Sequence, residues 1–137
     1  MEGGLGPDLK LKVGNPLNRV LLELAFPPSA NHYWRYVNSQ VLKSKDARDY
    51  IKAVGQVWMV SRQKAFPKDE RLKLEVLAMP KDKRRRDLDN LLKILCDALE
   101  SAGVFKNDSQ IDEIIIKRGQ QHPDGKLLLT LEPIERK

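Results

Sequence analysis

Side chains that can bind phosphates and a divalent metal are concentrated between residues 81 and 108. Carboxylates at Asp87 and Asp89 directly follow a run of cations. The cations are Lys81, Lys83, Arg84, Arg85 and Arg86. Mg²⁺ prefers oxygen ligands and is usually held by one or two carboxylates together with substrate phosphates. Because a bound divalent ion neutralises phosphate charge and lowers the pKa of an attacking water, these residues favour metal-dependent cleavage of phosphodiesters.

The residues after Asp87 are predicted to form an amphipathic helix. Its apolar residues recur at the spacing of one helical face: Leu88, Leu91, Leu92, Leu95, Leu99 and Ala102. Polar positions at Asp89, Lys93 and Asp97 fall on the opposite side, and Gly103 is expected to end the helix. A helix of this length spans roughly 22 Å. The chain must therefore fold back if Asp108, which follows a short loop, is to approach Asp87.

Each of these residues also has a purely structural interpretation. Asp87 is a good N-cap, and acids in a first helical turn suit the helix dipole. Asp89 and Lys93 have the spacing of an ordinary ion pair on a helix, and Asp108 has neighbours typical of a turn. A basic run is most often a solvated surface, although clustered cations favour an anionic partner. From the residues alone, both interpretations stay open.

The order of these residues resembles the signature of the RusA-type Holliday junction resolvases, the crossover junction endodeoxyribonucleases. Residues 84–91 (RRRDLDNL), with Lys93 and residues 97–99 (DAL), carry the centre of the resemblance. Residues 102–111 (AGVFKNDSQI) are similar to the family's loop with its third acid, and residues 26–34 (FPPSANHYW) to its opening motif. The resemblance extends from about residue 20 to residue 131, which is nearly the whole chain.

The resemblance implies a role for each matching residue. The family's paired acids correspond to Asp87 and Asp89, its third acid to Asp108, and its required lysine to Lys93. In the family the acids bind Mg²⁺, and a homodimer makes paired nicks across four-way junction DNA. For this chain we therefore expect symmetric cutting with Mg²⁺, for which Mn²⁺ is a possible substitute. The three arginines of residues 84–86 are then expected to grip backbone phosphates, as are Lys81 and Lys83. Lys93 is expected to stabilise phosphate charge or to orient the water.

The composition of the chain is that of one ordinary domain with an anionic partner. Its 137 residues are 41% hydrophobic and carry a net charge of +6, enough for one modest core and suited to a polyanion. Cys96 is the single cysteine, so it is expected to pack in the core rather than to form an intramolecular disulfide. No apolar run reaches the length of a membrane span and none resembles a signal peptide. We therefore expect a cytoplasmic protein, encoded by a bacterium or a phage.

The hydrophobic patterns predict an α+β fold: a single domain with a mixed β-sheet and helices packed on it. The expected order is strand, hairpin, helix, strand, helix, strand, strand. The strands are expected at residues 20–26, 72–78, 112–117 and 126–131, and the hairpin near residues 37–41. Residues 1–19, which are rich in Gly, Pro and Asn, are expected to be a flexible extension of a RusA-like endonuclease domain at residues 20–137.

The first long helix is expected to start after Ser44, whose hydroxyl can cap it, and to continue to about Phe66. Its predicted apolar face consists of Tyr50, Val54, Val57 and Trp58. We expect this helix to serve as scaffold or dimer contact rather than in catalysis.

Aromatic and basic side chains also gather after the first strand, at Tyr33, Trp34 and Arg35. Aromatic rings beside an arginine can stack on exposed bases, and a DNA junction offers unstacked bases at its crossover. The alternative is that the rings cover the edge of the sheet. Both interpretations are compatible with the sequence.

Two other classes of function are compatible with these features. The first is a catalytically silent protein that binds branched DNA, in which the acids serve only as helix caps and ion pairs. The second is a basic adaptor that binds RNA or an acidic protein and shows no preference for branched DNA over a duplex.

Overall fold

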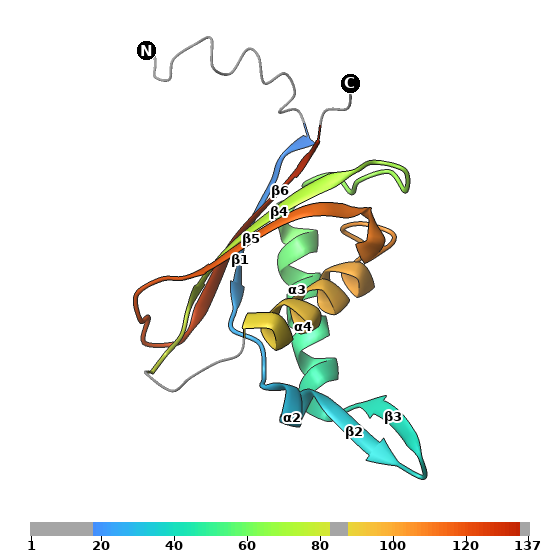
Figure 1. Cartoon of the computed structure of the whole chain (residues 1–137), viewed down its shortest axis with the longest axis vertical. Helices are drawn as coiled ribbons and strands as arrows, with labels where there is room; N and C mark the ends of the chain where they lie inside the picture. Colours follow the sequence, from blue (N-terminus) through green and yellow to red (C-terminus); the bar gives the residue numbers. More distant parts are fainter. Residues whose placement is uncertain (1–17, 83–87, 135–137) are drawn as a thin grey trace.

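The computed structural model describes residues 18–82 and 88–134 of the chain. Its main sheet has the strand order β1-β6-β4-β5 (Figure 1). The strands are β1 (Val20–Ala25), β4 (Leu72–Met79), β5 (Ile111–Arg118) and β6 (Lys126–Pro133). β4 and β5 pair in parallel, whereas β6 pairs antiparallel with both β1 and β4. The predicted mixed sheet of a single α+β domain is therefore confirmed.

Two long helices, α3 (Lys45–Ser61) and α4 (Leu88–Ala102), pack on one face of this sheet. The other elements are short: helix α2 (Ala30–Tyr33), hairpin strands β2 (Trp34–Val37) and β3 (Gln40–Lys43), and the 3₁₀ helix η2 (Asp108–Gln110). The hairpin forms a separate two-stranded sheet. Among the described residues, none of the helices combines the length and the apolarity needed to cross a membrane.

Strict alternation of side chains along the strands creates the core. In β1, β4 and β6 every second residue is buried, and the residues between are partly or fully exposed. The buried set is Val20, Leu22, Leu24, Leu72, Leu74, Val76, Ala78, Leu127, Leu129 and Leu131. Successive residues of a strand point to opposite faces, so the buried set forms the face against which α3 and α4 pack.

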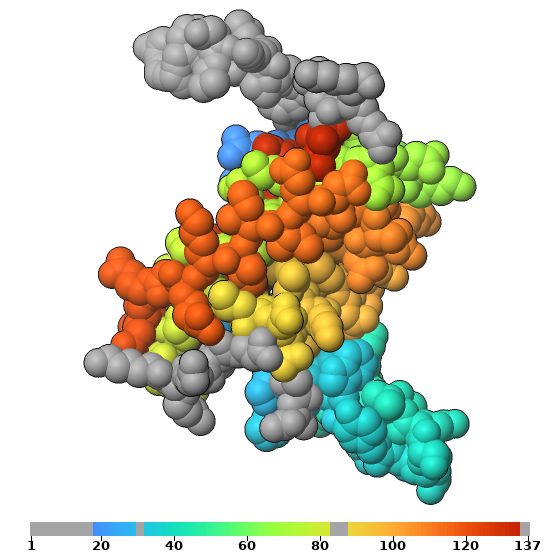
Figure 2. Space-filling model, viewed as in Figure 1, coloured from blue at the N-terminus to red at the C-terminus, as the bar shows by residue number. Residues whose placement is uncertain are grey.

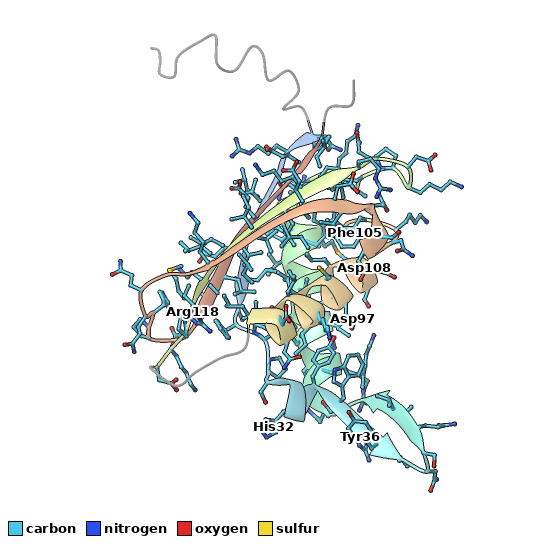
Figure 3. All side chains as sticks on the ribbon, viewed as in Figure 1. His32, Tyr36, Asp97, Phe105, Asp108 and Arg118 are labelled. Carbon is cyan, nitrogen blue, oxygen red and sulfur yellow. The ribbon has the colours of Figure 1, made fainter. Side chains whose placement is uncertain are left out.

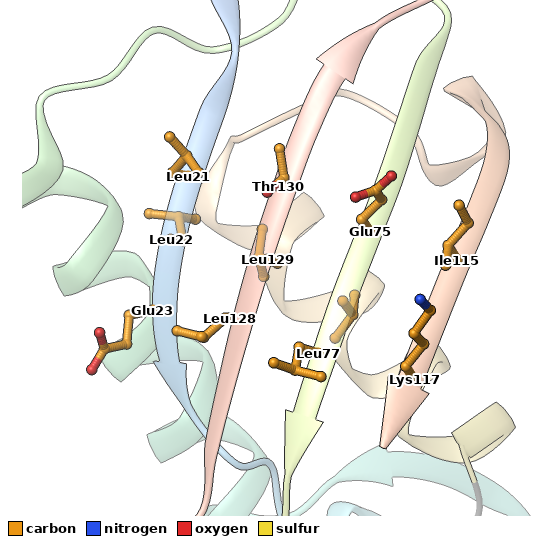
Figure 4. A pocket seen from close by; sticks show the side chains of 11 residues that line it. Leu21, Leu22, Glu23, Glu75, Leu77, Ile115, Lys117, Leu128, Leu129 and Thr130 are labelled. Atoms are coloured by element: carbon orange, nitrogen blue, oxygen red, sulfur yellow. The ribbon is translucent and has the colours of Figure 1, made fainter. Parts of the chain in front are cut away.

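The other face of the sheet carries exposed apolar side chains (Figure 4). Leu21 is 57% exposed, and Leu77, Ile115 and Leu128 are also exposed. These residues line a shallow hollow together with polar side chains such as Glu75. No helix of the described residues covers this face.

Helix α3 begins as predicted but ends earlier. The Ser44 hydroxyl accepts a hydrogen bond from the Ala47 N–H at 3.0 Å, which caps the first turn. The helix stops at Ser61 rather than near Phe66, because Arg62 adopts a left-handed conformation with φ 56°. Phe66 instead packs in the core, and its N–H donates to the Val104 carbonyl at 3.0 Å.

The apolar face of α3 also differs from the prediction. Tyr50 and Val54 are buried as expected, Trp58 is half-buried, and Ala47 joins the core. Val57 is 38% exposed and lines an open hollow beside β1 with Leu21 and Val60.

Helix α4 is the crossover that joins the parallel strands β4 and β5. Parallel neighbours require such a connection, because the chain must return to the end of the sheet from which it came. The register places Ile111 beside Leu72 and Arg118 beside Ala78. Gly103 ends the helix as predicted: it adopts φ 89°, and its N–H donates to the Glu100 carbonyl. The loop that carries Asp108 therefore lies beside the start of β4, not its end.

The side chain of Gln110 fastens this loop to the body of the protein. Gln110 is 2% exposed, and its amide nitrogen donates to the carbonyls of Pro67 and Glu70 at 2.9 and 3.0 Å. Its amide oxygen accepts from the N–H groups of Lys106 and Asn107 at 3.0 and 3.1 Å. One buried side chain therefore satisfies four backbone groups from two loops.

Replacing Gln110 by Leu should lower the free energy of unfolding by about 3 kcal/mol, because buried backbone groups lose their partners. Urea unfolding monitored by circular dichroism measures this, with an unchanged slope showing that only stability has changed. Gln120→Leu, at an exposed position, is the matched control and should stay within about 0.5 kcal/mol of the wild type. A similar midpoint for the Gln110 variant and the control would contradict the fastening role.

Candidate functional site

The polar side of α4 carries two residues predicted to do chemistry. Asp89 and Lys93 are exposed and lie one helical turn apart. The opposite side of the helix is buried in the core through Leu91, Ile94, Leu95, Cys96, Ala98 and Leu99. The ion pairs of the described residues do not include one between Lys93 and Asp89.

The basic run joins the end of β4 to the start of α4. Lys81 is exposed just after β4 ends. Lys83, Arg84, Arg85, Arg86 and Asp87 lie outside the described residues, and their roles stay predictions. Lys81 also borders an open hollow of about 760 Å³ whose other lining residues include His32 and Asp124.

Asp108 lies on a loop held in place by several hydrogen bonds. It is exposed as the first residue of η2, and its N–H donates to Glu100 Oε1 at 3.1 Å. Asn107 caps the same turn by accepting from the Ser109 N–H at 2.8 Å. Arg71 Nη2 donates to the Ser109 carbonyl at 2.7 Å from the start of β4. The Asp108 carboxylate is thus presented to solvent from a firm support (Figure 3).

The parallel pairing of β4 and β5 decides where Asp108 lies. The two strands are neighbours in the sheet, so the chain does fold back after α4. However, the register places the start of β5 at the start of β4, whereas Asp87 follows the end of β4. Glu100, the partner of Asp108, lies eleven residues after Asp89 on α4, roughly 16 Å along the axis. Within one chain, Asp89 and Asp108 therefore lie towards opposite ends of α4.

The exposed carboxylates of Asp89 and Asp108 are chemically suitable ligands for a divalent metal. Among the described residues of one chain, however, they do not belong to a cluster that could hold one. Aspartate oxygens are the ligands that Mg²⁺ prefers, and its ligand distances of about 2.1 Å require them to converge. Asp89 and Asp108 both offer such oxygens to solvent. Among the described residues, however, no three His, Cys, Asp or Glu side chains lie close enough together to hold a metal ion.

Asp97 joins α4 to the hairpin through two charge-assisted contacts. The Tyr33 hydroxyl donates to Asp97 Oδ2 at 2.5 Å, and Lys43 Nζ lies 3.0 Å from the same oxygen. Burial raises the pKa of Tyr33, and its hydrogen bond to Asp97 raises it further, so the hydroxyl stays a donor. The sequence indicated Asp97 as a polar helix position within the family motif, without a partner. Its partner Tyr33 is 64 residues away, which leaves no local signal for the contact.

The aromatic residues after β1 do not all face solvent. Tyr33 is 0% exposed, so the prediction that its ring stacks on a DNA base is wrong, and the ring belongs to the core instead. Trp34 is half-buried and packs edge-on against Tyr33, with ring centroids 4.8 Å apart. Arg35 is exposed. The physical reason is that Tyr33, the last residue of α2, packs against α4 and bonds to Asp97. Only the residues after Tyr33 extend away from the core into the hairpin.

Cys96 is a packing residue, as predicted. It is 6% exposed, and burial raises the pKa of its thiol to about 12, with the negative charges of Asp108 and Glu100 adding to the shift. The nucleophilic thiolate is therefore scarce in the folded protein near neutral pH.

Cys96 should react with a disulfide reagent such as DTNB at pH 8 at least about a hundred times more slowly in the folded protein than in urea, because the raised pKa and burial suppress the thiolate. Absorbance of the released thiol measures both rates. The folded rate should rise about ten-fold with each pH unit above 8 and level off only near pH 12, whereas the rate in urea should level off above the ordinary thiol pKa of about 8.5. Equal rates with and without urea would show that Cys96 is accessible.

Comparison with known proteins identifies relatives over almost the entire chain. The sequence profile of the family described as "Endodeoxyribonuclease RusA" matches residues 25–129. A protein of Enterobacteria phage HK97 named "Crossover junction endodeoxyribonuclease rusA" is 40% identical over 119 residues, covering 87% of this chain and 98% of that protein. The Escherichia coli protein of the same name is 30% identical over 118 residues, covering 84% and 95% of the two chains.

Proposed function

This chain belongs to the RusA family of endodeoxyribonucleases, and we propose that it resolves Holliday junctions by paired symmetric nicks in a Mg²⁺-dependent reaction. The observation that carries the proposal is the match over nearly the full length of a crossover junction endodeoxyribonuclease. The matched segment, residues 25–129, includes every acid and cation singled out in the sequence. The nuclease domain would span residues 20–137 and act in the cytoplasm during DNA recombination and repair.

The carboxylates at the start of α4 would hold the divalent ion. Asp87 and Asp89 supply oxygen ligands of the kind that Mg²⁺ prefers, and Mn²⁺ could substitute. An ion bound there would neutralise charge on the scissile phosphate and lower the pKa of the attacking water. Lys93, exposed one turn along the helix from Asp89, would donate hydrogen bonds to a phosphate oxygen or orient the water.

The cations around the start of α4 would hold the DNA backbone. Lys81 is exposed at the end of β4, and Lys83, Arg84, Arg85 and Arg86 continue the chain toward Asp87. Phosphate contacts from such residues position the nucleic acid without reading its sequence. They also make binding strongly dependent on salt, because each contact displaces a counterion. Trp34 and Arg35 would extend this surface from the base of the hairpin.

Asp89→Asn should abolish cutting of a labelled four-way junction and retain binding, because an amide is a weaker metal ligand and the phosphate contacts remain. The measurement combines denaturing gels in Mg²⁺ with binding assays in its absence. A loss in rate of about 10³-fold or more is expected, since metal-assisted activation of water is removed. Asp69→Asn, at an exposed position outside the site, is the matched control and should cut at the wild-type rate.

Two results would contradict the proposed reaction. If the wild type bound the junction but did not cut it in Mg²⁺ or Mn²⁺, the protein would be a silent binder of branched DNA. If it bound a duplex of the same length equally well, it would be a general nucleic-acid adaptor.

A homodimer would complete the metal site as well as cut two strands. Asp89 and Asp108 of one chain lie towards opposite ends of α4, because Glu100, whose side chain accepts from the Asp108 N–H, is about 16 Å from Asp89 along the helix axis. A third carboxylate for the ion at Asp87 and Asp89 would therefore come from the partner subunit's Asp108. Two-fold symmetry then produces two equivalent sites, which suits a junction with two strands to cut. The exposed apolar face of the sheet is one surface that could support self-association.

Mixed dimers test this arrangement directly. If the site is shared between subunits, an Asp89→Asn subunit paired with an Asp108→Asn subunit retains one intact site. It should nick one strand at roughly half the wild-type rate. If each subunit forms its own site, the mixed dimer has none and should be inactive. Differently tagged subunits, co-expressed and purified through both tags, supply the heterodimer.

The homodimers of each single variant are the controls and should both be inactive. Nicking by the mixed dimer alone would support the shared site. An inactive mixed dimer that still binds the junction would show that Asp108 acts within its own chain or not at all.

A further inference from the structure

The hairpin β2–β3 projects from the body of the protein and has no partner in the main sheet (Figures 1 and 2). Its turn residues Asn38 and Ser39 both have positive φ, 49° and 66°, as in the tight turns that match the twist of a hairpin. Apolar side chains are exposed along it: Tyr36 by 77%, Val41 by 57% and Leu42 by 43%. Exposed apolar surface of this extent on a projecting hairpin indicates a site of interaction.

The hairpin register shows which side these residues face. Tyr36 pairs with Val41, and Trp34 pairs with Lys43. Because side chains alternate along a strand, these four residues lie on the same face of the ribbon. Lys43 reaches Asp97 of α4 from that face at 3.0 Å. Tyr36 and Val41 therefore project beyond the body on the side of the ribbon that faces α4, the helix with Asp89 and Lys93.

The base of the hairpin is braced, so the exposed residues are held at a defined position. The Ser44 N–H donates to the Tyr33 carbonyl at 2.9 Å, and its hydroxyl donates to the His32 carbonyl at 2.5 Å. Arg48 Nη1 donates to the Lys43 carbonyl at 3.0 Å. The contacts of Tyr33 and Lys43 with Asp97 link this base to α4. A group that binds at Tyr36 would thus be fixed relative to the polar side of α4.

The charges of the hairpin suit a polyanion. Residues 34–43 include Arg35 and Lys43 but no acid, and Arg35 is exposed. Lys43 is engaged by Asp97, so Arg35, on the face of the ribbon opposite Tyr36, is the cation open to a phosphate. An exposed cation near the base and an aromatic ring farther out match a nucleic acid, in which phosphates surround apolar base faces. Stacking on an aromatic ring requires a base that is not enclosed in a duplex. The crossover of a branched DNA provides such bases.

We propose that the hairpin β2–β3 is a junction-reading arm, in which Tyr36, supported by Val41 across the ribbon, stacks on a base at the crossover. This inference rests on the proposed function and adds the element that distinguishes a branch point from a duplex. Side chains that insert at base steps partly unstack them, and the braced base of the hairpin holds the opened crossover at a fixed distance from α4.

Tyr36→Ala should weaken binding to a four-way junction about ten-fold, the loss expected for one base–aromatic stack. Binding to a duplex of the same length should change by less than about two-fold, because phosphate contacts dominate there. Fluorescence anisotropy with labelled DNA at fixed salt measures both affinities. Tyr36→Phe keeps the ring and should restore junction binding. Met59→Ala is the matched control, because Met59 is 75% exposed near the far end of α3 and should leave both affinities unchanged.

A junction with 2-aminopurine at the crossover gives a second readout. Its fluorescence should change on binding of the wild type and Tyr36→Phe at saturating concentration, and not on binding of Tyr36→Ala. Equal affinities and equal fluorescence changes for wild type and Tyr36→Ala would overturn the proposal. So would a Tyr36→Ala variant that sediments as a monomer while the wild type is a dimer, because the hairpin would then bind a second copy of the chain.

These outcomes are separate from failure of the proposed function. A wild type that cuts junctions while Tyr36→Ala binds them equally well removes only the role of the arm. A wild type that shows no preference for junctions removes both.

Discussion

Burial of one side of α4 against the sheet is the constraint on which the rest of the site depends. Leu91, Leu95 and Leu99 are at most 5% exposed, and each buried leucine contributes about 1.5–3 kcal/mol to stability. Because that side of α4 is buried, Asp89 and Lys93 on the opposite side face solvent. Because α4 is also the crossover between parallel strands, its two ends lie at opposite ends of the sheet. The same packing that orients the polar residues thus separates Asp89 from Asp108.

A second constraint comes from the half-buried carboxylate of Asp97. It accepts a hydrogen bond from the buried Tyr33 hydroxyl and lies 3.0 Å from the ammonium group of Lys43. Polar groups withdrawn from water are tolerated only when they find such partners, and hydrogen bonds with a charged partner are the stronger kind. The contact therefore selects one position of the hairpin relative to α4. Helix α2, the hairpin and α4 are thereby held in fixed positions relative to one another. Together they support the surface that would bind DNA.

The positions of the acids suggest what the proposed homodimer would contribute to the metal site. One chain offers Asp89 near the start of α4 and Asp108 beside its other end, and the loop around Asp108 is held by Gln110, Arg71 and Glu100. Such a loop does not move easily toward the start of its own helix. A symmetric partner could supply the missing carboxylate without deforming either chain. Metal binding, and hence cutting, would then depend on assembly, which limits nicking to a complex able to cut both strands.

Patterns among neighbouring residues were sufficient to predict many of the helices and strands of this protein. The period of α4, the alternation in β4, the Ser44 cap and the glycine that ends α4 each depend on neighbouring residues, and the sequence predicted them correctly. It also indicated Asp89 and Lys93 as positions on the polar side of the helix, and Asp108 as an acid in the loop after it, because residue types and spacing are local properties. The direction of pairing between β4 and β5, the early end of α3, the burial of Tyr33 and its bond to Asp97 were decided only by tertiary structure. These features depend on contacts between residues far apart in the chain, 64 positions in the case of Tyr33 and Asp97, and no local pattern records which distant surfaces will meet.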